Sequence, residues 1–390
     1  MATKPPGENL AKKLMHPRRR LRPPPLEKGS QEVVALVDTY FNAYNASRIR
    51  EACQLLTRAI DEGATIGVSL SGALTPAGLS SVITPLIGAG FIDYISSTGA
   101  NLYHDLHFDL GLPLYRGGPS VSTGALDVKL REDGVIRVYD VLFPADVLYK
   151  TDEWLMRVML ADEFDKRMGT AELHNRLGRY AMETARKTGS EKPSILATCH
   201  QHGVPVYSPS PGDSTIGLNF SAIHTYDAER GPHVDPAIDV AEMAALVLDA
   251  KRGTGKGATS AVVIFGGGAP KNFLLQTEPQ LQEILGISES GHDYFVQFTD
   301  ARPDTGGLSG ATPAEAVSWG KIDPDKLPDA IVAYVDSTIA MPIVGSYLMA
   351  KCKPRKPRHL YDKLPEVMAK LRTEYRGSPL YKRYFGKPKK

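Results

Sequence analysis

Apolar positions recur at helical spacing in several parts of the chain. Between Val33 and Ile60 they fit two amphipathic helices, and residues 150–190 and 235–252 show the same period. A further stripe near the end of the chain predicts a terminal helix that docks on the rest of the protein: Leu360, Leu364, Val367 and Leu371.

Short apolar runs alternate with these helical segments, and each run ends in small or glycine-rich residues. Four runs show this order: 66–70, 92–95, 204–207 and 261–265. The order predicts an α/β fold, namely a single large domain with a mainly parallel, doubly wound Rossmann-like sheet flanked by helices. Ligands of such sheets bind at the loops that follow the strands. We therefore expect the four loops to converge on one nucleotide-sized site.

The chain divides into three parts by composition. Residues 1–30 contain two proline runs and the basic run Arg18–Arg20, with few apolar residues, which predicts an extended arm that is either solvated or docked on a neighbouring subunit. Residues 31–350 form the predicted α/β domain. Residues 351–390 form a basic helical tail.

Composition and charge exclude several classes of protein. The 390 residues can bury a sizeable core, and 46 Lys plus Arg against 44 Asp plus Glu argue against nucleic-acid binding through global charge. No apolar run approaches the roughly 18 residues that span a bilayer, and no signal peptide is evident. Cys53, Cys199 and Cys352 are far apart, which predicts buried thiols in a reducing compartment. We expect a cytoplasmic protein.

The segment from Thr305 to Lys321 is the richest in candidate chemistry. Thr312, Pro313 and Glu315 fit the N-cap, N1 and N3 positions of a capping box, so a helix is expected to begin here. Backbone N–H groups of the preceding glycine run would then face an anion such as a phosphate. Glu315 itself fits either a cap or a ligand-binding carboxylate.

Lys321 also allows two interpretations. It follows Trp319-Gly320 and fits a surface lysine beyond the end of a helix. It also fits an amine nucleophile, because desolvation beside the indole would lower its pKa and supply the neutral amine that forms imines.

Several familiar motifs fail on inspection. Residues 253–257 lack the spacing and the ending of a Walker loop, and residues 307–310 are one position short of a nucleophile elbow with no strand leading into them. No G-x-G-x-x-G follows a strand, so NAD would have to bind by another arrangement. The histidine pairs 104/107 and 200/202 lack a third ligand, and we predict no metal site.

Four segments together resemble the deoxyhypusine synthase family: Gly266-Gly267-Gly268, Ser309-Gly310-Ala311, the run from Glu315 to Ile322, and Asp336-Ser337. The resemblance covers roughly residues 31–350. It implies one α/β domain, a homotetramer with NAD and polyamine substrate at subunit interfaces, and an N-terminal segment that can plug a neighbouring active site.

The resemblance also implies a two-stage NAD reaction. Spermidine is oxidised to an imine, diaminopropane leaves, the aminobutyl unit is held as an imine on Lys321, and an acceptor amine takes it before reduction. Glu315 and Trp319 match residues that hold and cover the polyamine. The matches to NAD-binding residues are Ser71, Gly72, Ala73, Thr75, Pro76, Thr98, Gly99, Asp213, Gly267, Gly306, Gly307, Ser309, Asp336 and Ser337.

The chain departs from hypusine-forming members at several pocket positions. Tyr103-His104 stands where they have paired glutamates, Asn272 where they have a catalytic histidine, and Leu308 where they have an acid; another acid is replaced at Leu218 or Asn219. Several carboxylates that would pair with a polyamine are therefore missing, and an ammonium group buried without such a partner costs several kcal/mol. We expect the substrate pocket to differ from that of hypusine-forming members.

This pattern is similar to the bacterial deoxyhypusine synthase-like branch, some members of which make homospermidine. We therefore expect an alkyl (aminobutyl) transferase that acts on spermidine and putrescine. The expected catalytic residues are Lys321, Glu315, Trp319, Asn272 and His104. Two alternatives stay open, namely a true deoxyhypusine synthase that modifies a protein lysine and a non-catalytic NAD-binding oligomer.

Overall fold

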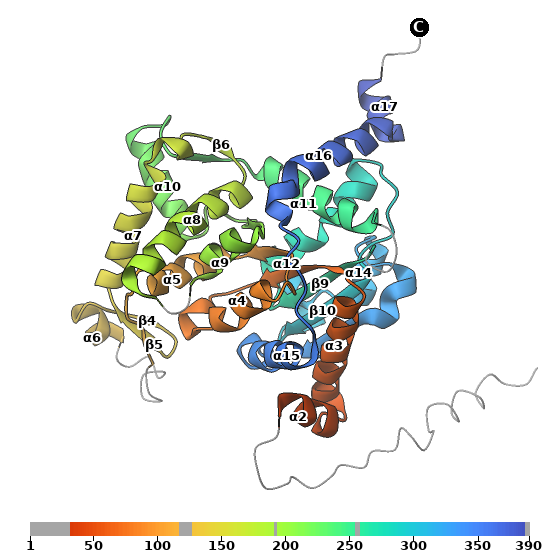
Figure 1. The fold of residues 1–390 in the computed structure, drawn as a ribbon, viewed down its shortest axis with the longest axis horizontal. Helices are drawn as coiled ribbons and strands as arrows, with labels where there is room; N and C mark the ends of the chain where they lie inside the picture. The colour runs from red at the N-terminus through yellow and green to blue at the C-terminus, as the bar shows by residue number, and fades with distance from the viewer. Residues whose placement is uncertain (1–31, 117–126, 191–192, 254–257, 387–390) are drawn as a thin grey trace, which may run out of the picture.

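A six-stranded parallel sheet forms the centre of the protein (Figure 1). The computed structural model describes residues 32–116, 127–190, 193–253 and 258–386, so the predicted N-terminal arm lies outside the described residues. The strands are β1 (Thr65–Leu70), β2 (Tyr94–Ser97), β7 (Val206–Tyr207), β9 (Ser260–Phe265), β10 (Tyr294–Thr299) and β11 (Ala330–Tyr334).

The order β11-β10-β9-β1-β2-β7 makes the sheet doubly wound. The chain runs outward from β1 through β2 to β7, then returns to β9 on the other side of β1 and continues to β10 and β11. All five strand pairs are parallel. The predicted fold class is confirmed, and the switch point where ligands bind in such sheets lies between β1 and β9.

Helices cover both faces of the sheet, which explains why β1, β9 and β10 are buried along their whole length. Along β9, Val263 and Phe265 join the core beneath α3, α4 and α15, whereas Val262 and Ile264 join the core beneath α11 and α12. This alternation follows from the two-residue period of a strand.

The predicted helical stretches correspond to α2 with α3, to α7 and α8, to α11 and to α16, although a 3-10 turn and a short strand divide the predicted stretch 150–190. Their bounds are α2 (Val33–Tyr40), α3 (Tyr44–Asp61), α4 (Ser80–Gly88), α5 (Gly99–Asp109), α6 (Asp127–Glu132), α7 (Asp146–Met159), α8 (Thr170–Thr188), α9 (Ile195–His202), α10 (Thr215–Tyr226), α11 (Pro236–Lys251), α12 (Gly268–Leu275), α13 (Thr277–Pro279), α14 (Pro313–Ser318), α15 (Ser337–Lys351), α16 (Leu360–Gly377) and α17 (Pro379–Phe385). A π-helical turn, Gln280–Ile284, follows α13.

Two small sheets lie beside the central one. The first contains β3 (Tyr115–Arg116), β4 (Val135–Val138) and β5 (Val141–Pro144), and the second pairs β6 (Lys166–Met168) with β8 (Pro232–Val234). Short 3-10 turns complete the described part: Thr75–Ala77, Asp162–Phe164, Pro303–Thr305, Leu308–Gly310 and Pro324–Asp329.

The tail docks on the domain as its apolar stripe predicts. The buried residues of α16 pack against α11 and are Leu360, Leu364, Val367 and Leu371. The three cysteines are free and buried, which confirms the prediction of core thiols. Within the described part of the chain, no helix has the length and apolar character that crossing a membrane requires.

A buried ion-pair cluster fastens the segment between α15 and α16 to the sheet. Asp93 is almost fully buried just before β2, and its carboxylate accepts a hydrogen bond from the backbone N–H of Ile66 at 2.8 Å. Arg355 lies 3.3 Å and Arg358 3.4 Å from this carboxylate. Arg355 also donates to the Ala64 and Gly90 carbonyls at 2.9 Å, so the cluster joins both strand starts to the tail.

Candidate functional site

The loops at the carboxyl ends of the strands contact one another in sequence across the sheet. The Thr98 hydroxyl, after β2, donates to the Gly72 carbonyl, after β1, at 2.6 Å. Ser71 exchanges hydrogen bonds with the backbone of Gly267, after β9. These contacts bring the predicted first, second and fourth loops together at the switch point.

Two further contacts extend this edge to its neighbours. A Cβ atom on Gly99 would lie 2.3 Å from the side chain of Ser214, so the predicted third loop, which carries the exposed Asp213, packs closely on the second. On the other side, the Gly268 N–H donates to the Ser309 hydroxyl at 2.9 Å. The expected convergence of loops is therefore present.

The glycine run 306–310 lies on the loop that follows β10. No strand runs directly into residues 307–310, as expected, because β10 ends at Thr299 and the 3-10 turn Pro303–Thr305 intervenes. The run is thus a fifth loop at the same edge, beside the Gly266–Gly268 loop.

Glycine backbones leave room for a ligand along these loops. Gly72, Gly268 and Gly306 have φ values of +67°, +59° and +74°, and nothing lies within 4 Å of a Cβ placed on any of them. Gly267 is the N-cap residue just before α12, and a Cβ there would meet Ser309 at 2.4 Å. Backbone N–H groups at a helix start and open glycine surfaces are the features that bind a phosphate group. The loops therefore fit an extended anionic cofactor such as NAD.

Some predicted cofactor residues have structural partners in this chain. The Thr75 hydroxyl donates to the Asn101 carbonyl at 2.7 Å, and the adjacent Pro76 is buried, whereas Gly72 and Ala73 are exposed. The Asp336 carboxylate caps α15 by accepting from the Thr338 N–H at 2.8 Å. Two residues complete the predicted set. Gly307 is exposed, and the Ser337 hydroxyl lies 3.4 Å from the Phe298 carbonyl.

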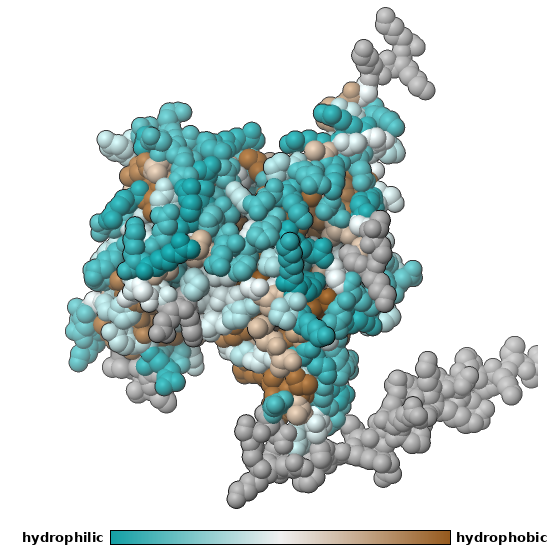
Figure 2. All heavy atoms as spheres, in the orientation of Figure 1, coloured by the Kyte–Doolittle hydropathy of each residue, from teal (hydrophilic) through white to brown (hydrophobic). Residues whose placement is uncertain are grey.

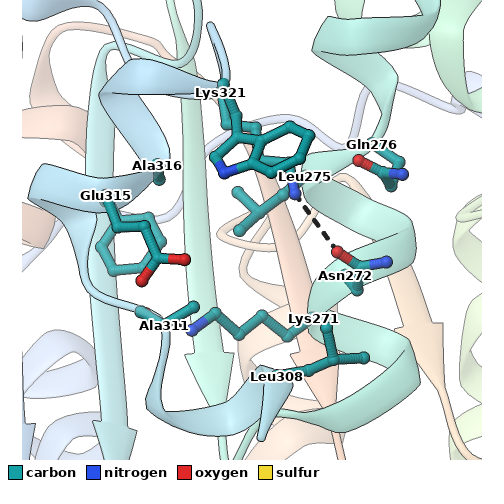
Figure 3. A pocket seen from close by; sticks show the side chains of 11 residues that line it. Lys271, Asn272, Leu275, Gln276, Leu308, Ala311, Glu315, Ala316 and Lys321 are labelled. Carbon is teal, nitrogen blue, oxygen red and sulfur yellow. Dashed lines mark hydrogen bonds between the residues drawn. The ribbon is translucent and has the colours of Figure 1, made fainter. Parts of the chain in front are cut away.

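A cavity of about 250 Å³ brings together four of the five predicted catalytic residues (Figure 3). It lies between α12, β10 and α14, next to the glycine run. Its lining residues are Lys271, Asn272, Leu275, Gln276, Phe295, Leu308, Ala311, Glu315, Ala316, Trp319 and Lys321.

The Glu315 carboxylate lines the cavity, whereas the cap bond at the start of α14 involves only the backbone of Glu315. Its backbone N–H donates to the Thr312 hydroxyl at 3.2 Å, which confirms the predicted N-cap of α14. Its carboxylate is not needed for that bond and lines the cavity. A positively charged group inside the cavity could therefore pair with Glu315.

Lys321 points its amine into the cavity. The amine donates to the Asn272 side-chain oxygen at 3.3 Å and lies 5.6 Å from the centre of the Trp319 ring. Burial lowers the pKa of Lys321, and the charges of Glu315 and Glu283 only partly oppose this effect. The neutral amine is therefore more populated than in an ordinary lysine, as imine chemistry requires.

Lys271 is a second cavity lysine, which sequence reasoning did not assign to the site. Its buried amine donates to the Ala311 carbonyl at 2.7 Å and to the Gln297 side chain at 2.9 Å, so it fixes the glycine loop against β10. Burial, with help from the charge of Lys321, lowers the pKa of Lys271 to about 8. The sequence feature that could have pointed to Lys271 is its position three residues after Gly268, in the first turn of a helix.

His104 lies in a different cluster of the chain. It is on α5, where its Nδ1 lies 3.1 Å from Nε2 of His107, and Nδ1 of His107 lies 2.8 Å from the Thr151 hydroxyl. Burial lowers the pKa of His107 to about 3, so this pair stays neutral near pH 7. Within one chain His104 does not line the Lys321 cavity. The described residues hold no group of His, Cys, Asp or Glu arranged to bind a metal.

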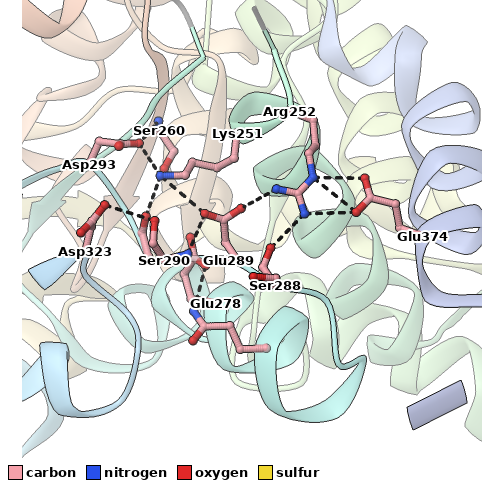
Figure 4. A network of polar contacts seen from close by, with 12 residues as sticks. Lys251, Arg252, Ser260, Glu278, Ser288, Glu289, Ser290, Asp293, Asp323 and Glu374 are labelled. Carbon is pink, nitrogen blue, oxygen red and sulfur yellow. Dashed lines mark hydrogen bonds and ion pairs between the residues drawn. The ribbon is translucent and has the colours of Figure 1, made fainter. Parts of the chain in front are cut away.

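A buried polar network, of which Figure 4 shows Lys251, Glu278 and Asp293, contacts the backbone of the segment that carries Lys321. The His292 N–H donates to the Lys321 carbonyl at 3.1 Å, and the Gln282 side chain donates to the Gly320 carbonyl at 2.8 Å. Beside them, Lys251 pairs with Asp293 at 2.8 Å. Lys321 is thus held on a segment that several buried groups keep in place.

Glu278 is the fully buried carboxyl group of this network. Its pKa is raised to about 8, first by burial and then by the charge of Glu289, while Lys251 opposes the shift. Among the described residues, its Oε1 atom has no hydrogen-bond partner. Below about pH 8, the carboxyl group of Glu278 is therefore mainly protonated and neutral in the folded protein.

We expect Glu278→Gln to become more stable relative to wild type as the pH rises. The folded pKa of about 8 exceeds the ordinary glutamate pKa of 4.5, so wild type loses stability as the pH rises through this window, whereas glutamine cannot ionise. The difference in unfolding free energy should grow by on the order of 4 kcal/mol between these pH values, as urea unfolding can measure. The exposed Glu153→Gln serves as a control with no such trend, and an equally flat Glu278→Gln difference would contradict the assignment.

Comparison with known proteins gives consistent results across the chain. A family model described as deoxyhypusine synthase matches residues 35–348. The chain is 56% identical over 345 residues to a deoxyhypusine synthase-like protein of Nostoc sp., with 88% of each chain covered. It is 36% identical over 333 residues to a Methanosarcina acetivorans protein named "Probable deoxyhypusine synthase 2", with 84% of this chain and 89% of that protein covered.

One solved structure shares the fold. A crystal structure assigned to a deoxyhypusine synthase of Entamoeba histolytica superposes with a TM-score of 0.55 at 13% identity. The match covers 87% of this chain and 100% of that one. At this level of identity the likeness supports the doubly wound architecture.

Proposed function

The chain belongs to the deoxyhypusine synthase family, and from this premise we propose that it is an NAD-dependent aminobutyltransferase. It takes a 4-aminobutyl unit from spermidine, holds it on Lys321 and transfers it to a small amine, which gives homospermidine when the acceptor is putrescine. The observation that carries the proposal is the Lys321 amine, whose pKa burial lowers, in a cavity with Glu315, Trp319 and Asn272.

The composition of the cavity favours a small acceptor over a protein lysine. Among the described residues, Glu315 is the one carboxylate that lines it, and by the family resemblance Asn272 and Leu308 occupy positions where hypusine-forming members carry a histidine and an acid. The identity levels agree, since the deoxyhypusine synthase-like relative is more similar to this chain than the Methanosarcina protein.

Each cavity residue has a distinct role in the proposed reaction. Glu315 pairs with an ammonium group of the polyamine, and the exposed Trp319 ring covers the aliphatic chain. The strand-end loops that carry Ser71, Gly268 and Ser309 would hold NAD, which would supply the hydride acceptor for the carbon beside the secondary amine and the hydride donor for the final product. The neutral Lys321 amine attacks that carbon once it is an imine, and Asn272 orients the amine through its side-chain oxygen.

The exchange on Lys321 balances without a separate base. When the Lys321 nitrogen bonds to the carbon, the bond to diaminopropane breaks, and the proton that Lys321 loses leaves on the departing amine. The acceptor amine then adds to the same carbon and releases Lys321 as a free amine. Asn272 cannot take up a proton, so its part is limited to positioning.

We further propose that the protein works as a homotetramer. Large hydrophobic side chains of α15, Ile339 and Met349, are 56% and 45% exposed. Figure 2 shows hydrophobic residues gathered near α2, which packs against α15. Exposed apolar surface of this kind is typical of a face that another subunit covers.

A product assay tests the proposed function directly. Purified protein incubated with NAD, spermidine and putrescine should release diaminopropane and form homospermidine in equal amounts, as mass spectrometry can quantify. Omitting NAD should stop both products. Diaminopropane release that depends on an added protein instead of putrescine would favour the alternative, a true deoxyhypusine synthase. Absence of both products would leave the non-catalytic NAD-binding oligomer.

A further inference from the structure

We propose that a second hollow, beside the Lys321 cavity, is the acceptor subsite and takes a short aliphatic diamine. The far ammonium group of the diamine pairs with Glu283, and its near amine reaches the carbon that Lys321 holds. This inference rests on the proposed function and adds to it the place and the chemistry of the second substrate.

The two hollows adjoin each other. The second has a volume of about 440 Å³ and shares three lining residues with the Lys321 cavity, namely Asn272, Gln276 and Leu308. These three residues form the boundary between the spaces. A linear molecule that lies across the boundary would have one end in each hollow.

The lining of the second hollow fits an aliphatic chain with one positive end. Its apolar residues include Met243, Phe273 and Ile284, and among the described residues that line it Glu283 is the only charged one. In the other hollow, Glu315 pairs with the ammonium group of the aminobutyl unit, and Lys271 repels a second positive charge. A diamine therefore binds most favourably with its ammonium group at Glu283 and its neutral amine toward Lys321.

Backbone geometry ties Glu283 to the nucleophile. Glu283 and Ile284 are consecutive residues of the π-helical turn Gln280–Ile284, an irregular element that is frequent at functional sites. The preceding residue, Gln282, donates to the Gly320 carbonyl at 2.8 Å. The carboxylate and the nucleophile are thus attached to two segments that hydrogen-bond directly.

The electrostatics agree with this arrangement. The negative charge of Glu283 favours the protonated form of Lys321, in keeping with the hydrogen bond that joins their two segments. When a diamine neutralises Glu283, this effect weakens, and the neutral amine of Lys321 becomes easier to form.

The proposed transfer needs no reagent beyond the two amines. The near amine of the acceptor adds to the imine carbon on Lys321, the bond from that carbon to the Lys321 nitrogen breaks, and the proton of the attacking amine leaves with Lys321. The product is an imine between the aminobutyl unit and the acceptor. Its reduction uses the hydride that the first stage stored.

The test compares putrescine with butylamine, which has the same chain but no second ammonium group. We expect Glu283→Gln to raise the KM for putrescine about five- to ten-fold and to change that for butylamine less than about two-fold. The control Glu229→Gln removes an exposed carboxylate on the turn after α10 and should match wild type for both amines.

Borohydride trapping without an acceptor distinguishes a failure of the proposed function from a failure of the proposed acceptor subsite. A wild-type protein that traps no aminobutyl adduct on Lys321 would refute the proposed function itself. If wild type forms the adduct but Glu283→Gln changes the KM of putrescine and butylamine equally, the function stands and the acceptor subsite is overturned.

Discussion

The Lys321→Ala variant is expected to form homospermidine at least about 1000-fold more slowly than wild type, because alanine cannot hold the aminobutyl unit. In wild type the amine sits 3.3 Å from the Asn272 oxygen and is partly desolvated, so it can attack as a neutral base. Lys321→Arg should fail equally, since a guanidinium keeps the charge but stays protonated near neutral pH.

The control for this prediction is Lys326→Ala, five residues further along the chain. Lys326 does not line the cavity, so its removal should leave product formation within about two-fold of wild type. Reduction with borohydride during turnover should add the aminobutyl mass to the Lys321 peptide of wild type. A Lys321→Ala protein that keeps a tenth of the wild-type rate would show that the amine is not the nucleophile.

Much of the fold was predictable because strand and helix periods are local. The four apolar runs became β1, β2, β7 and β9. β10 and β11 were not among them, for two physical reasons. The loop after β10 spans 13 residues before α14 begins, which hides the alternation of strand and helix. β11 is an edge strand with only Ala333 buried, so its apolar signal is weak.

Local sequence pointed to the candidate site mainly through one short segment, and Asn272 was added only through the family resemblance. Glu315, Trp319 and Lys321 lie within seven residues and meet in the cavity. Lys271 and Glu283 precede β10 in the sequence, whereas Lys321 follows it. The local sequence pattern does not show that α12 and the π-helical turn pack beside Lys321. Such neighbours follow from sheet order and helix packing, which need the tertiary structure.

His104 illustrates the same limit from the other side. The family resemblance groups it with Lys321, whereas this chain places it on α5 among His107, Tyr103 and Phe143. Its catalytic role stays a prediction. A family resemblance assigns a role to each matching residue, but it does not show which of these residues lie together within one subunit.

Asp93→Ala is expected to lower the free energy of unfolding by about 3 to 5 kcal/mol, a large share of the total stability of a typical domain. The substitution leaves the Ile66 N–H without its acceptor and the Arg355 guanidinium, whose side chain is 17% exposed, without its carboxylate. Because Arg358 also loses its partner, the start of α16 should loosen from β1 and β2.

Urea unfolding of Asp93→Ala, Arg355→Ala and the double variant measures this contribution. The double variant should lose less stability than the sum of the two single changes, because each single change leaves a buried charge unpaired and the double change removes both. Glu153→Ala is the matched control, since its partner Arg157 and Glu153 itself are each 70% exposed, and its cost should stay below about 1 kcal/mol. If Asp93→Ala costs no more than this exposed pair, the cluster does not fasten the tail to the sheet.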